Sequence, residues 1–114
     1  MTLSNKCTNP EMAEIIEAGL NRAIPYKFQL MDFEFSGQDS GFLIVCMKKG
    51  GITEFVTWAF SNTGGNFSVF WGHYFPVWND QDIWKEYGKA YTDYYDRVGI
   101  DTSFNAVLET MGGK

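Results

Sequence analysis

Apolar residues recur with two different periods along this chain. From Asn9 to Ile24 they return every three or four positions, as in an amphipathic helix, and Asn9 followed by Pro10 is a typical helix start. From Tyr26 to Phe75 most apolar residues alternate with others, as in strands. From Asp80 the helical period returns, carried by aromatic residues. The pattern therefore predicts a helix, a run of strands and then one or two helices.

The strand region divides into four segments. A change of phase near Leu30 and Met31 predicts a β-bulge in the first strand, and residues 42–47, apolar throughout, indicate a central strand. We expect an α+β fold with a four-stranded antiparallel β-meander, an N-terminal helix and one or two C-terminal helices packed on the sheet. The chain is expected to form a single domain over residues 1–114, with residues 1–8 and 112–114 flexible.

Counting from the turns gives a register. A tight hairpin at residues 50–51 sets Met47 opposite Glu54, and a four-residue loop at residues 62–65 sets Glu54 opposite His73 and Phe55 opposite Gly72. One face of the sheet should then receive the helices. It carries Leu43, Val45, Met47, Val56, Trp58, Phe60, Phe67, Val69, Trp71 and Phe75.

The opposite face, called the outer face below, is unusually apolar for a surface exposed to solvent. It carries Phe42, Ile44, Cys46, Phe55, Phe70 and Tyr74, together with Asp32 and Glu34 on the first strand. A solvated sheet face normally alternates apolar and polar residues, so something is expected to cover this one. The C-terminal helix, a protein partner and a second copy of the chain all remain open as the cover.

Composition excludes several classes of function. The chain has 114 residues and a net charge of -5, which disfavours direct nucleic-acid binding. It lacks an apolar run long enough to cross a membrane and an export signal at its start, so we expect a cytoplasmic protein. Cys7 and Cys46 are expected to be reduced, and no cofactor or metal is expected because close ligand pairs are lacking.

Candidate chemistry is sparse. His73 is the only histidine, and its predicted neighbour Glu54 could orient it as a general base. A structural hydrogen bond explains the same pair more simply. The tyrosines of the C-terminal helix are expected to form a core stripe, and Asp93 is expected to belong to a solvated acidic edge.

Four short motifs carry a resemblance. They are Phe55-Val56-Thr57-Trp58, Gly64-Gly65, Gly72-His73-Tyr74-Phe75 and Asp93-Tyr94-Tyr95-Asp96-Arg97. Together they resemble a pattern in small uncharacterised proteins of bacteriophages and other mobile elements. The resemblance implies a genomic setting and a fold, and it brings no activity with it.

The favoured hypothesis is a non-enzymatic protein-binding module, encoded by a phage and inhibiting a host defence protein in the host cytoplasm. Aromatic residues are good interface anchors, and the predicted interface comprises Phe55, Phe70, Tyr74, Asp32 and Glu34. A second hypothesis is a small enzyme or ligand-binding domain that uses Glu54 and His73 in a pocket of Trp58 and Trp71. A third is a homodimer that stacks through the outer face at Phe55.

Overall fold

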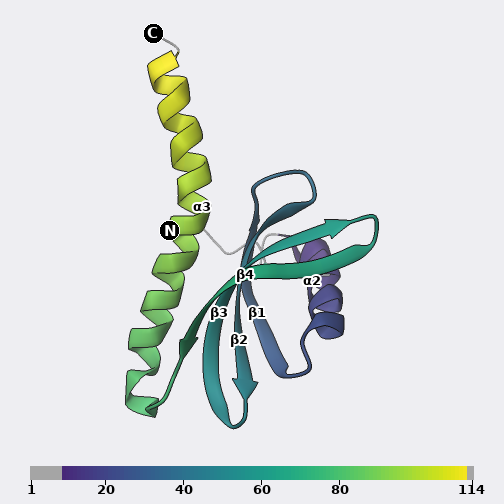
Figure 1. The fold of residues 1–114 in the computed structure, drawn as a ribbon, viewed down its shortest axis with the longest axis vertical. Helices are drawn as coiled ribbons and strands as arrows, with labels where there is room; N and C mark the ends of the chain where they lie inside the picture. Colours follow the sequence, from purple (N-terminus) through teal and green to yellow (C-terminus); the bar gives the residue numbers. More distant parts are fainter. Residues whose placement is uncertain (1–8, 113–114) are drawn as a thin grey trace.

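The computed structural model describes residues 9–112 and has an α+β fold (Figure 1). The predicted flexible segment at residues 1–8, Cys7 within it, and residues 113–114 lie outside that range. Strands follow one another in the order β1-β2-β3-β4 within one antiparallel sheet, as predicted. The elements are α2 (Pro10–Ala23), β1 (Lys27–Phe35), β2 (Ser40–Lys49), β3 (Ile52–Thr63), β4 (Asn66–Pro76), the short 3-10 helix η1 (Asp80–Asp82) and α3 (Ile83–Gly112).

Helix α2 starts and packs as its sequence predicts. The Asn9 side chain accepts a hydrogen bond from the Met12 amide, and Pro10 occupies the first helical turn. Its apolar stripe buries Ile16 and Leu20 against the sheet. Gly19 allows a close approach, because a Cβ atom there would lie 2.4 Å from the Phe67 ring.

The two long helices lie on opposite faces of the sheet (Figure 1). The expectation that one face would receive the helices holds for α2 alone, because α3 packs on the outer face. On the α2 face the core joins helix residues to Leu43, Val45, Val56 and Phe60. On the other face α3 covers Ile44 and Phe55. Of the three possible covers for the outer face, the C-terminal helix is the one present.

The second hairpin follows the predicted register, and the first contains the predicted bulge. The register of β1 and β2 shifts between Leu30 and Asp32, where the change of phase predicted a bulge. Gly50 and Gly51 have φ angles of 60° and 80°, as a tight two-residue turn requires, and Met47 pairs with Glu54.

The third hairpin differs from the prediction. Gly64 and Gly65 both have positive φ and form a two-residue turn, so Thr63 pairs with Asn66 in place of the predicted pairing of Ser61 with Asn66. The sequence of two glycines fits either loop length, and the backbone adopts the shorter one.

A β-bulge in β4 then changes the register a second time. Ala59 pairs with Phe70 and Thr57 pairs with His73, so Trp71 and Gly72 of β4 face the single residue Trp58 of β3. Beyond the bulge, each residue of β4 lies on the face opposite to the one predicted. Phe75 consequently packs beneath α3, and Tyr74 pairs with Val56 on the α2 side.

Helix α3 is one continuous helix. A stop at Gly99 was predicted, followed by a separate short helix, but the backbone stays helical to Gly112. Glycine costs only about 1 kcal/mol in a helix, and no proline follows to block continuation. The second half of α3 runs on past the sheet (Figure 1). The side chains from residue 100 onward, including the predicted apolar stripe of the short helix, lie outside the described part.

Candidate functional site

The bulge in β4 displays two aromatic side chains to solvent. Trp71 has a φ of 54° and is 73% exposed, and its ring meets the Phe70 ring edge-on at 5.0 Å. It is the only described residue other than glycine with a positive φ. This left-handed conformation is rare for a bulky residue and costs roughly 1–2 kcal/mol. We call Phe70 and Trp71 the β4 wedge.

Arg97 of α3 fixes the backbone of the wedge from behind. Its guanidinium donates to the carbonyl oxygen of Trp71 and, at 3.2 Å, to that of Thr57. The same group lies 5.5 Å from the centre of the Phe42 ring. Partial burial lowers the pKa of Arg97, while neighbouring Asp93 acts in the opposite direction. The backbone of the β4 bulge at Trp71 is therefore hydrogen-bonded directly to α3.

A polar cluster adjoins this anchor. Asp93 accepts a hydrogen bond from the Thr57 hydroxyl at 2.5 Å, and its other oxygen lies 2.9 Å from Nδ1 of His73. The imidazole is half exposed. An imidazole held at Nδ1 by a carboxylate leaves Nε2 for proton transfer, as in many hydrolytic sites. The described residues place no serine, cysteine or threonine within hydrogen-bond distance of Nε2.

The aromatic stripe of α3 forms a continuous ladder of rings. Neighbouring centroids lie 4.8–5.5 Å apart along Trp84, Tyr87, Tyr91 and Tyr95. Phe55 packs edge-on against Tyr87, and Tyr94 is buried. The stripe was predicted to be core, and it is core only along its inner side, since Trp84 and Tyr95 are exposed.

Burial and nearby carboxylates both raise the pKa values of tyrosines in this stripe. Burial is the main cause that raises the pKa values of Tyr91 and Tyr94, and the charge of Asp32 raises both further. Asp32 of β1 pairs with Ile44, which belongs to the same core cluster as Tyr94. Its Oδ1 also accepts a hydrogen bond from the Phe33 amide at 2.8 Å.

The structure divides the predicted interface residues. Phe55 is 3% exposed and lies beneath Tyr87, and Asp32 is 8% exposed, so neither offers a free surface. Glu34 is exposed. Phe70 and Tyr74 are also exposed, but the bulge places them on opposite faces of the sheet. Since α3 covers Phe55, a second copy would have to meet a surface other than the predicted outer face.

Glu54 and His73 are not neighbours. Glu54 pairs with Pro76 and points to the α2 face, whereas His73 pairs with Thr57 and reaches Asp93 on the α3 face. The predicted pair is therefore wrong, because the count across β4 missed both the shorter turn and the bulge. One carboxylate oxygen of Glu54 is buried without a hydrogen-bond partner among the described residues.

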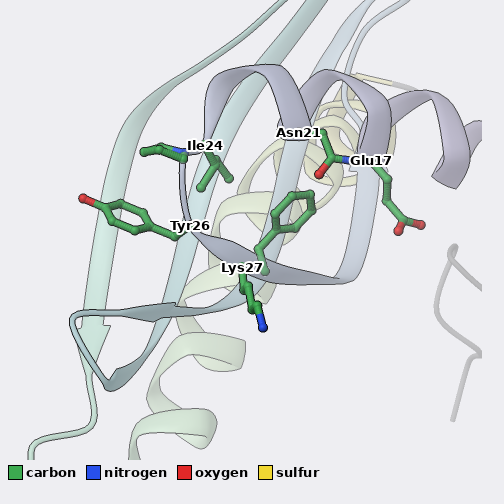
Figure 2. Close-up of a pocket in the computed structure, with 7 residues that line it drawn as sticks. Glu17, Asn21, Ile24, Tyr26 and Lys27 are labelled. Carbon is green, nitrogen blue, oxygen red and sulfur yellow. The ribbon is translucent and has the colours of Figure 1, made fainter.

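Two hollows border the connection between α2 and β1. The wider one, about 620 Å³, has both polar and apolar walls: Glu17 and Asn21 come from α2, and Lys27 and Phe28 from the start of β1 (Figure 2). The Tyr26 ring extends to the opposite side of the connection (Figure 2). There it borders a smaller cavity of about 170 Å³ with Trp58 and Tyr74. Trp71 does not line this cavity, so the predicted pocket of Trp58 and Trp71 is wrong, and Trp58 lines the cavity with Tyr74 instead.

Sequence reasoning missed three residues of this region. Trp71 was predicted to be core, Asp93 to be solvated, and Arg97 appeared only within a motif. One signal was present: the Trp71-Gly72 pair inside a strand, since a glycine there often marks a bulge. The motifs Gly72-His73 and Asp93 to Arg97, which are distant in sequence, meet at this point.

Comparisons with family models, with curated proteins and with solved structures return no match.

Proposed function

We propose that this protein is a non-enzymatic protein-binding module whose principal anchor is the β4 wedge, Phe70 and Trp71. On the resemblance to small bacteriophage proteins, the proposed partner is a host protein, a defence component that the module inhibits in the host cytoplasm. Among the described residues, no helix is both long and apolar enough to cross a bilayer.

One observation carries this proposal. Trp71 is held in a costly left-handed conformation, and its side chain is 73% exposed, so the strain is not offset by burial within the chain. Bulges often re-aim side chains at functional sites, and tryptophan is the residue most enriched among interface hot spots. A partner that buries the indole would offset the strain.

Rigidity supports the same interpretation. Arg97 fixes the carbonyl of Trp71, and the ring of Phe70 lies against the indole. A preorganised anchor loses little conformational entropy on binding. Trp78 offers a matched comparison, because it is 76% exposed but lacks the positive φ.

The test is site-specific photo-crosslinking in a bacterial lysate. A photoreactive phenylalanine analogue placed at position 71 should give one dominant crosslinked species, and the same analogue at position 78 should give much less. Unlabelled wild-type protein should compete the species away, whereas the double variant Phe70→Ser, Trp71→Ser should not. Equal crosslinking from both positions, or equal competition by the double variant, would contradict the proposal.

A second candidate function, a small enzyme, draws on the contact between His73 and Asp93 at 2.9 Å. In that case His73 acts as a base oriented by Asp93, and Glu54 takes no part. Replacing His73 with Gln would abolish turnover while partner capture through the β4 wedge persisted. Unchanged turnover in the His73→Gln variant would contradict the role of His73 as the base.

A further inference from the structure

The smaller cavity lies where α2 stops short of the end of the sheet. The helix ends at Ala23, and Pro25 turns the chain into β1, so no helix of the described residues covers the sheet face beyond Ile24. A cavity of about 170 Å³ remains between this connection and the sheet. The sheet contributes Met47, Lys49, Trp58, Val69 and Tyr74 to its lining.

Gly72 has no side chain, and this lets the rings of Trp58 and Tyr74, which line the cavity, contact each other. A Cβ atom at Gly72 would lie 2.6 Å from Nε1 of Trp58 and 2.6 Å from the Tyr74 hydroxyl. Their rings contact edge to face at a centroid separation of 6.2 Å. An indole N-H and a phenol hydroxyl are thus held together in an otherwise largely apolar setting.

One cation borders the cavity. The Lys49 ammonium lies 5.7 Å from the centre of the Tyr26 ring, and no carboxylate of the described residues comes within ion-pair distance of it. Neighbouring Lys48 instead donates to the Thr53 hydroxyl at 2.6 Å. Glu54 lies on the same sheet face as Lys49 but does not line the cavity. Among the described residues, Lys49 is therefore the charged side chain that lines the cavity.

We propose that this cavity binds a small single-ring aromatic carboxylate, with the ring against Trp58 and Met47 and the carboxylate at Lys49. The size fits, since a cavity of about 150 Å³ accommodates benzene. Apolar walls with a few convergent polar groups are typical of small-molecule sites. Neither residue of the β4 wedge lines the cavity, so this site is independent of the proposed protein interface.

Benzoate is the probe for the test, and benzamide is its uncharged counterpart of the same shape. In an NMR titration of the whole chain, benzoate should shift the Trp58 indole N-H signal saturably, with a Kd of about 1 mM. Benzamide should bind about three- to fivefold more weakly, as expected for loss of one exposed ion pair. Lys49→Gln should remove the difference between the two probes, and the matched control Lys48→Gln should preserve it.

A variant that fills the cavity tests whether benzoate binds there. Val69→Phe places a ring in the cavity and should abolish the saturable shift. If Val69→Phe does not fold, the test rests on Lys49→Gln, whose side chain is exposed and which should remove the difference between benzoate and benzamide. The proposal is overturned if benzoate produces no saturation at about 10 mM, tenfold above the expected Kd. It is equally overturned if benzamide binds as well as benzoate to the wild type, or if Val69→Phe binds benzoate unchanged.

Discussion

The two faces of the sheet are stabilised in different ways. The α2 face is a continuous apolar core in which Ile16, Leu43 and Phe60 are fully buried. The α3 face combines a smaller core with polar contacts to the helix, notably those of Asp93 and Arg97. The difference suggests two roles. The α2 face provides most of the apolar core, and the α3 face fixes the β4 bulge with its exposed aromatic residues.

The largest expected effect is on the α2 face. Phe60→Ala removes a fully buried ring that stacks on Phe67 and should lower the free energy of unfolding by about 3–5 kcal/mol. Phe42→Ala, on the half-buried α3 side, should cost no more than about 2 kcal/mol. Urea denaturation measures both values. Equal losses would show that the two faces contribute alike.

The next effect concerns the anchor on the α3 face. Arg97→Met removes the hydrogen bonds to the carbonyls of Trp71 and Thr57 and should cost about 1–2 kcal/mol. Exposed Lys85 provides the control, since Lys85→Met should change stability by less than about 0.5 kcal/mol. Amide exchange should also accelerate around the bulge in the Arg97 variant alone. If the amide exchange rates around the bulge were unchanged in Arg97→Met, Arg97 would not be what fixes the bulge.

Alkaline pH should weaken the α3 face selectively. The folded-state pKa values of Tyr91 and Tyr94 lie above the ordinary value of 10.0, so the folded state holds these protons more tightly than the unfolded state. The stability they contribute is complete below about pH 10 and is lost as pH rises toward the folded-state pKa values. Tyr94→Phe should flatten the fall in unfolding free energy above pH 10.

The smallest effect on stability is expected in the wedge itself. Trp71→Gly relieves the left-handed strain and should leave the unfolding free energy unchanged or raise it by up to about 1 kcal/mol. Trp78→Gly, which has no such strain to relieve, should lower it by roughly 0.5–1 kcal/mol. Thermal or urea unfolding of the pair checks the sign. A clear loss in the Trp71 variant would mean that the indole supports the fold.

Much of the fold follows from local pattern. The helical period, the start at Asn9, the hairpin at Gly50 and Gly51 and the bulge near Met31 are all present in the structure because each depends on a few neighbouring residues. The face that receives the C-terminal helix could not be decided from the sequence, because both faces are apolar. Either of them could have received α3.

The candidate site was harder to predict for a related reason. A register count carries every error forward, so the shorter turn at Gly64 and the extra residue at Trp71 together misplaced His73, Tyr74 and Phe75. A period of two changes face with each residue of slip. Arg97 of α3 contacts Trp71, which lies 26 residues earlier in the sequence. A contact between such distant positions produces no hydrophobic period in the sequence, so pattern analysis could not predict it.

The most direct test of the proposed interface is the partner affinity of Trp71→Ala relative to Trp78→Ala. Both variants remove an indole that is about three-quarters exposed, and only one removes it from the strained bulge. A hot-spot tryptophan contributes about 2 kcal/mol or more, so Trp71→Ala should raise the Kd for the crosslinked partner about thirtyfold while Trp78→Ala changes it less than about threefold. Equal changes, or a larger one at Trp78, would contradict the proposed role of the β4 wedge.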